Sequence, residues 1–280
     1  MVELKSFHSK ISKLKEPYCK VHFRNETLFK SCLIASFSKA ADLGVSLFKD
    51  TDKEEAYFKT ASLRGICEEI IVLLYIDNVL SPNQNEVIKH LVSLSLAKDL
   101  KSQEDFFKAK HPMQPILDSR LYSDRQEPQN GIKLILNQKG IEGNKLPPVE
   151  QMAQRVNLSE LYSYMYRATS NFVHFNPAHL IRMGWGKDMK EATFKVSHFF
   201  KYYSMFNRFY ISYLIVVFCK EFKTQLKLKG EIWKVIVALE KELDKYLTWP
   251  EIVTFEEMNL KRPSEIVTVL RMSQKKLSGQ

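Results

Sequence analysis

The residues best suited to chemistry lie on one face of a single predicted helix, residues 158–175. Its polar positions recur every three or four residues, which places them along one side of a helix. They are Glu160, Ser163, Arg167, Ser170, Asn171 and His174. A face that only meets solvent more often carries lysine and glutamate. An arginine, small hydrogen-bonding side chains and a histidine are instead the types that bind a phosphate and transfer a proton.

Arg167 and His174 are the two candidate catalytic residues of this face. They lie two helical turns apart, about 10 Å along the axis, so their side chains can converge on one ligand. An imidazole exchanges protons near neutral pH, and a guanidinium binds phosphate oxygens and stabilises developing charge. Cleavage of RNA by its own 2′-hydroxyl needs only these two roles. The alternative is that both residues belong to a structural polar network inside a helical bundle.

A second polar pair, Arg64 and Glu68, lies one turn apart in a strongly apolar predicted helix, residues 54–80. Arginine precedes glutamate, which is the weaker order for an ion pair within one helix. We therefore expect each side chain to reach another element, with Glu68 directed toward Arg167 or His174. The alternative is an ion pair that ties helices together.

The composition indicates which partners the protein has. The 280-residue chain has a net charge of +10, which favours an acidic partner, nucleic acid first. Its four cysteines are scattered without a C-x-x-C pair, so neither a zinc site nor a disulfide framework is expected. No cofactor motif is present, and we expect no cofactor. Without a secretory signal or a long enough apolar stretch, we expect a cytoplasmic protein with no membrane contact.

Low contents of glycine and proline favour long helices over a turn-rich fold. We expect the main helices at residues 23–48, 54–80, 81–110, 158–175, 192–228 and 231–247. Ser81 and Asn157 are predicted to cap two of them, and Asn176 with Pro177 to end the polar helix. The segment Gly184 to Gly186 is expected to form a turn.

These elements predict an all-α protein with a single large helical bundle over residues 21–260. Residues 1–20 are expected to form a weakly structured basic arm, and residues 261–280 a short basic tail. The predicted helix 192–228 is rich in aromatic residues all round. It carries more apolar surface than one helix face can bury, so we expect part of it to form a homodimer interface.

Two motifs give the chain a family resemblance. The first is R-x3-E, at Arg64 and Glu68. The second is P-x-E-x2-A followed by Y-R-x2-S-x3-H, at Pro148, Glu150, Ala153, Tyr166, Arg167, Ser170 and His174. Together they resemble a bacterial all-helical family of unknown function that is often found in defence-associated settings. The resemblance extends over residues 25–260 and includes the segment TWPEIVTFEEMN at residues 248–259.

More distantly, Arg167 and His174 are similar to the R-x4–6-H motif of HEPN domains. That resemblance implies a HEPN-like, metal-independent ribonuclease in which two motifs meet across a homodimer. It assigns the scissile phosphate to Arg167 and proton transfer to His174. The expected supporting residues are Tyr166, Ser170, Asn171, Arg64 and Glu68. Ala168 follows Arg167, where active HEPN nucleases usually carry a polar residue.

Three functional interpretations remain open. The first is an RNA-cleaving toxin or antiphage effector. The second is a non-catalytic module whose polar residues bind a nucleotide or lock the bundle. The third is an interaction partner of another defence component. Catalysis predicts that Arg167 and His174 converge in an open cleft, whereas a structural network predicts that both are buried. An interaction partner predicts an exposed apolar patch.

Overall fold

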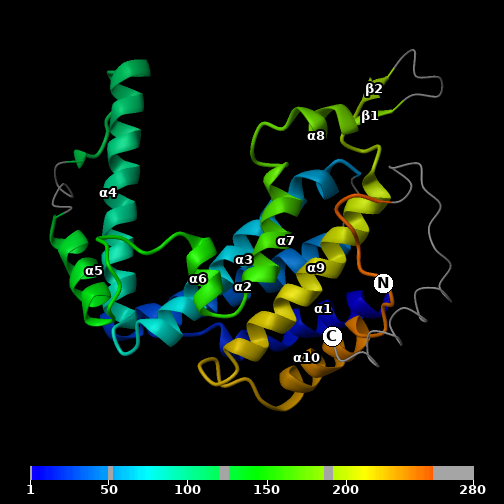
Figure 1. Ribbon diagram of the computed structural model, residues 1–280, viewed down its shortest axis with the longest axis horizontal. Coiled ribbons are helices and arrows are strands. Elements are labelled where there is room, and N and C mark those ends of the chain that lie inside the picture. Colours follow the sequence, from blue (N-terminus) through cyan, green and yellow to red (C-terminus); the bar gives the residue numbers. More distant parts are fainter. Residues whose placement is uncertain (1, 50–52, 120–125, 186–191, 255–280) are drawn as a thin grey trace.

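The computed structural model describes residues 2–49, 53–119, 126–185 and 192–254. These residues form helices almost throughout, with one short pair of strands, so the all-α prediction is confirmed (Figure 1). In chain order the elements are α1 (Val2–Leu14), α2 (Leu28–Lys49), α3 (Glu55–Val79), α4 (Gln84–Lys110), α5 (Gln126–Gln138), α6 (Val149–Arg155), α7 (Ser159–Ser170), α8 (Pro177–Arg182), β1 (Gly184–Trp185), β2 (Thr193–Phe194), α9 (Phe200–Glu221) and α10 (Gly230–Leu243). Two short 3₁₀ helices, Glu16–Tyr18 and Asn25–Thr27, precede α2.

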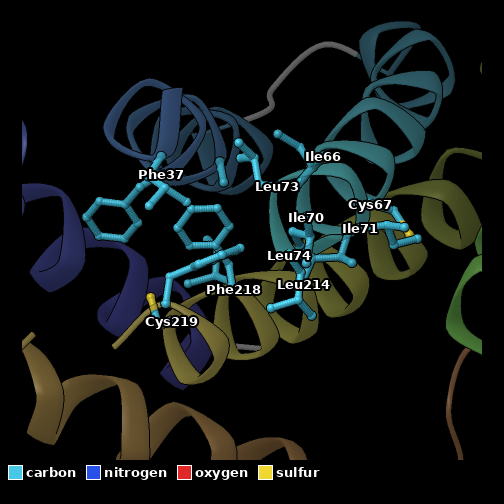
Figure 2. Packing of buried hydrophobic residues seen from close by; sticks show 14 of the residues in the cluster. Phe37, Ile66, Cys67, Ile70, Ile71, Leu73, Leu74, Leu214, Phe218 and Cys219 are labelled. Atoms are coloured by element: carbon cyan, nitrogen blue, oxygen red, sulfur yellow. The ribbon is translucent and has the colours of Figure 1, made fainter. Parts of the chain in front are cut away.

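The centre of the bundle is α9, which packs against both α2 and α3. Figure 2 shows side chains of these three helices meeting in one apolar cluster, where the ring of Phe37 stacks on that of Phe218 at 6.0 Å. Four consecutive residues of α9, from Phe209 to Ser212, are buried. Successive residues of a helix point in different directions, so the middle of α9 is covered on all sides, whereas Met205 near its start is exposed. The apolar surface from which we expected a homodimer interface is therefore covered within one chain.

The predicted arm at residues 1–20 is wrong, because most of it is the helix α1. Leu4 and Ile11 of α1 are fully buried, and the helix packs against α10 and α2. A leucine and an isoleucine seven residues apart lie on the same helix face, which provides the apolar contact that holds α1 in the bundle. The predicted tail, residues 261–280, lies outside the described residues.

One stretch is long and apolar enough to cross a membrane by length and composition, residues 25–49, most of which is α2. Half of its most apolar window is buried inside the bundle. Its buried side chains pack on α3 and α9, which is the behaviour of a core helix.

Several helix ends differ from the sequence prediction because local signals compete. α4 begins at Gln84 with Asn83 as its N-cap, not at Ser81. Asn157 does not cap α7: its φ is 60°, in the left-handed region, and Leu158 takes the cap position. Asparagine tolerates this conformation better than most residues, so it serves the turn between α6 and α7.

The other changes concern the start of the aromatic helix and the segment before it. α9 begins at Phe200 rather than at residue 192, because Thr193 and Phe194 pair with Trp185 and Gly184 in a short antiparallel ribbon. The predicted turn at Gly184 is thus the first residue of a strand. A Cβ atom there would lie 2.8 Å from the ring of Phe194, so the close approach of the two strands requires glycine. Figure 1 shows α8 and this ribbon at one end of the bundle. It also shows α4, with α5 beside it, extending away from the bundle.

Candidate functional site

The packing of α3 against α7 brings Arg64 to the end of α7. The neighbouring residues Leu63, Ile66 and Cys67 are buried in the core, which leaves Arg64 and Glu68 on the flank of α3 that faces α7. The Nη1 atom of Arg64 lies 3.2 Å from Nε2 of His174 and 3.3 Å from Oγ of Ser170. Two helices far apart in sequence thus contribute to one polar cluster.

The contact with Arg64 determines the tautomer of His174. A guanidinium can only donate hydrogen bonds, so Nε2 of the imidazole accepts and the ring proton lies on Nδ1. The imidazole is exposed to solvent. His174 therefore presents a basic nitrogen at the surface, directed toward a cation and a hydroxyl group.

Glu68 and Tyr166 hold the guanidinium of Arg64 in place. Glu68 Oε1 accepts from Nε of Arg64 at 2.8 Å, and the Cζ atom of Arg64 lies 4.4 Å from the centre of the Tyr166 ring. Partial burial lowers the pKa of Arg64, but the hydrogen bond and the charge of Glu68 outweigh it, and the net pKa is raised. Burial and the same carboxylate raise the pKa of Tyr162, whose ring lies 5.4 Å from that of Tyr166. Both groups stay in their usual protonation states at neutral pH.

His174 is held by a turn and not by a continuous helix. α7 ends at Ser170, five residues before the predicted end at residue 175, although the amide of His174 still donates to Ser170 O at 2.9 Å. Phe172 anchors the turn, because its ring packs between those of Tyr57 and Tyr203, at 4.9 and 5.4 Å. Phe175, which follows His174 in this turn, is 85% exposed.

Arg167 does not take part in the cluster as the spacing predicted. Its side chain is exposed and has no hydrogen-bond or ion-pair partner within the described part of the chain. It lies one helical turn before Ser170, so its Cβ atom is roughly 5–6 Å from that of Ser170 on the same side of α7. Arg64 occupies the place beside His174 that the sequence assigned to Arg167.

Two other supporting residues also differ from expectation. Glu68 pairs with Arg64 of its own helix and not with Arg167 or His174. Asn171 accepts from Nδ2 of Asn176 at 2.6 Å, which closes the turn 171–176 and takes Asn171 out of the cluster. Sequence analysis missed Tyr162, although its spacing of four residues from Tyr166 was a usable signal.

Residues suited to holding a metal do not gather in this cluster. Among the described residues, no group of three or more histidine, cysteine, aspartate or glutamate side chains is placed to hold a metal ion. The cluster offers a base, a hydroxyl group and the guanidinium group of Arg64 near the surface, and the exposed Arg167 lies one helical turn from Ser170. This set can bind an anion and accept a proton from a neighbouring hydroxyl.

No curated protein and no solved structure gives a significant match to the chain. A family model matches residues 59–192, slightly less than half of the chain, and this segment contains Arg64, Glu68 and the whole Y-R-x2-S-x3-H element. The predicted resemblance extended further, over residues 25–260. The middle of the chain is similar to DUF5677, a family of unknown function. The expected resemblance to a family of unknown function is confirmed to this extent.

Proposed function

We propose that this protein is a HEPN-like, metal-independent endoribonuclease with His174 as its proton-transfer group. The observation that carries the proposal is the contact of Arg64 with both His174 and Ser170 at the surface. It places an unprotonated imidazole nitrogen beside a guanidinium group, and RNA cleavage by the 2′-hydroxyl requires a base and a cation of this kind. The net charge of +10 supports a polyanionic substrate. A toxin or antiphage effector is the corresponding cellular role.

In this proposal the phosphate replaces His174 as the partner of Arg64. The guanidinium contact with the imidazole is 3.2 Å long, and hydrogen bonds to an ionised phosphate are shorter and stronger. Once released, Nε2 takes the proton of the 2′-hydroxyl while the 2′-oxygen attacks phosphorus. The bond from phosphorus to the 5′-oxygen breaks, and the departing oxygen takes a proton from the imidazolium. The products are a 2′,3′-cyclic phosphate and a 5′-hydroxyl end.

In this proposal Arg167 provides the positive charge that binds the phosphate, because the charge of Arg64 is partly neutralised by Glu68. Because Glu68 neutralises much of the charge of Arg64, a second cation is needed to attract the phosphate. Arg167 is exposed, has no side-chain partner among the residues described, and lies one turn from Ser170. Its fork can bind phosphate oxygens in a bidentate manner.

Cleavage of a labelled single-stranded RNA by the purified protein tests the proposal. We expect activity that survives EDTA and leaves a 2′,3′-cyclic phosphate end. His174→Ala should lower the rate by about 10²–10⁴-fold, the usual contribution of a proton-transfer group. Arg167→Lys should also lower it, because an ammonium group cannot reproduce the guanidinium fork.

His22→Ala is the matched control, because His22 is exposed and lies outside the cluster. Its rate should equal that of the wild type. Wild-type protein that leaves every tested RNA intact contradicts the proposal. So does a His174→Ala variant that cleaves at the wild-type rate while retaining the wild-type melting temperature.

A second candidate function, a protein-interaction module, is favoured by the apolar surface around α8. Exposed apolar side chains gather between residues 173 and 194. They are Val173, Phe175, Leu180, Ile181 and Phe194. Contiguous exposed apolar side chains often mark a surface that another protein covers. If the protein is an interaction module, the Arg64 cluster is a structural connection between α3 and α7. His174→Ala should then lower the melting temperature, and neither the variant nor the wild type should cleave RNA.

A further inference from the structure

A cavity of about 820 Å³ lies between the end of α7, α8, the start of α9 and residues 252–254. Sites for small molecules usually measure roughly 300–1,000 Å³, so this cavity can enclose one. Arg64, Ser170 and His174 do not line it. The cavity is therefore a separate site, and its argument does not depend on the proposed nuclease activity.

The apolar wall of the cavity is held in position by hydrogen bonds. Tyr202, Met205 and Ile252 contribute to this wall. The hydroxyl group of Tyr202 donates to Glu251 O, and Nη1 of Arg182 donates to Ile252 O at 3.0 Å. These bonds connect α8 and α9 to the segment after α10, so a ligand would not have to order the wall itself.

The charged side chains that line the cavity are all cationic. Arg182 and Lys201 line it, and among the residues that the structure describes no aspartate or glutamate does. Within residues 2–49, 53–119, 126–185 and 192–254, the ammonium group of Lys201 has no ion-pair or hydrogen-bond partner. Lys201 also lies in the first turn of α9, where the helix dipole disfavours a cation. A bound anion would relieve both the charge excess and the dipole repulsion.

The turn that carries His174 also borders the cavity. Asn171 and Asn176, at the two ends of this turn, both line it. Asn176 uses its amide nitrogen on Asn171 and its oxygen on the backbone of His179. The amide nitrogen of Asn171 has no acceptor in the described part of the chain, so it can donate to a ligand. An amide donor of this kind suits the edge of a nucleobase.

We propose that this cavity binds a nucleoside phosphate. The positive charge of Lys201 favours a ligand with an anionic group over a neutral apolar ligand. The apolar wall requires a ring or another apolar group, which excludes a bare inorganic anion. The phosphates would contact Lys201 and Arg182, the base would lie against Tyr202 and Met205, and Asn171 would donate to the base. Binding would also fix the ends of the turn that carries His174.

Isothermal titration calorimetry of the full-length protein with ATP tests this proposal, without RNA and at about 0.15 M salt, where screening weakens unspecific charge attraction. We expect one site with a Kd below about 1 mM. Lys201→Glu should weaken binding about tenfold or more, because it reverses the charge at the phosphates. Met205→Trp should weaken it by filling the cavity. Both positions are exposed, so the variants should keep the wild-type melting temperature.

Lys241→Glu is the matched control, because it makes the same change of charge at an exposed lysine of α10 that does not line the cavity. It should bind ATP as the wild type does. Adenosine and tripolyphosphate should each bind about tenfold more weakly than ATP, since each lacks one half of the recognised ligand.

Three outcomes would overturn the proposal. Equal loss in Lys201→Glu and Lys241→Glu would show that only the overall charge attracts ATP. Tripolyphosphate that binds as tightly as ATP would show a site for polyanions and not for nucleosides. No binding at several times the expected Kd would show that the cavity takes no nucleotide.

Discussion

At the scale of single residues, Arg64 connects more groups than any other side chain of the candidate site. It donates to Glu68, Ser170 and His174, and it stacks on Tyr166. About a fifth of the Arg64 side chain is exposed, and somewhat more of Glu68. An arginine in this position contributes to stability and to the placement of His174 at the same time, and the two contributions can be separated by variants.

We expect Arg64→Met to lower the free energy of unfolding by about 1–2 kcal/mol. The apolar stem is kept, but the ion pair and two hydrogen bonds are lost, and Glu68 is left half-buried without its partner. Ser170→Ala should cost less than about 1 kcal/mol, because it removes one long hydrogen bond. Urea denaturation followed by circular dichroism measures both values.

Lys101→Ala is the control for the loss of an ordinary ion pair at the same spacing. Lys101 pairs with Asp105 on the exposed face of α4, where such a pair contributes about 0.5 kcal/mol or less. An Arg64→Met variant as stable as Lys101→Ala would contradict the structural part of the role of Arg64.

At the scale of elements, α1 is held in the bundle by a buried histidine as well as by apolar contacts. Nε2 of His8 lies 2.8 Å from Oγ of Ser212, and that hydroxyl group donates its own proton to Arg208 O. The hydroxyl therefore accepts, and His8 carries its proton on Nε2. The bare Nδ1 faces Gly44, where a Cβ atom would lie 2.2 Å from it. Gly44 thus makes room for the ring.

Burial lowers the pKa of His8 from 6.5 to about 4. Above pH 6.5 the ring is neutral in both states and pH has no effect through it. As the pH falls below 6.5, the unfolded chain binds a proton that the folded protein does not, so stability is lost until the pH reaches about 4. We expect a loss of about 2 kcal/mol between pH 7 and pH 5 from this residue, given about 1.4 kcal/mol per pH unit.

Urea denaturation at pH 7 and pH 5 of wild type and His8→Gln measures this loss. Glutamine keeps a donor for Ser212 but does not titrate, so the variant should lose about 2 kcal/mol less than the wild type over this range. His22→Gln is the control, because His22 is exposed. An equal pH dependence of His8→Gln and wild type would show that His8 is accessible to protons in the folded protein.

Across the whole molecule, the exposed apolar side chains lie on a different surface from the one where we expected an oligomer interface. The aromatic residues of α9 are covered by α2, α3 and α10. The apolar residues that remain exposed lie around α8, where 85% of Phe175 and 69% of Ile181 are accessible. If the protein is a homodimer, as we propose, this is the surface on which the second copy would pack.

We expect light scattering to show a dimer at concentrations of tens of micromolar, the range in which a weak apolar interface is populated. The double variant with Phe175→Asp and Ile181→Asp should be a monomer, because charges at both positions would be buried unpaired. Val92→Asp is the control, because Val92 is an exposed valine on α4. A monomeric wild type, or a dimeric double variant, would contradict this prediction.

Local sequence patterns were sufficient to predict the helical architecture and most residues of the candidate site. Periodic apolar positions specify a helix through contacts between residues three and four apart, so α3 was predicted almost to its ends. The polar residues of α7 and the pair Arg64 and Glu68 were recognised for the same reason. The end of α7 was missed, because no strong local signal follows Ser170 and Phe172 fixes the turn by packing on Tyr57 and Tyr203.

The identity of the guanidinium beside His174 depends on tertiary packing. Spacing along one helix favoured Arg167, but the packing of α3 against α7 brings Arg64 there and leaves Arg167 exposed. The same holds for α1, which lies in the segment that we expected to be a weakly structured basic arm and is covered by α10 and α2. Contacts between helices far apart in sequence carry no local signature, so they are the part of the fold and of the site that periodicity cannot supply.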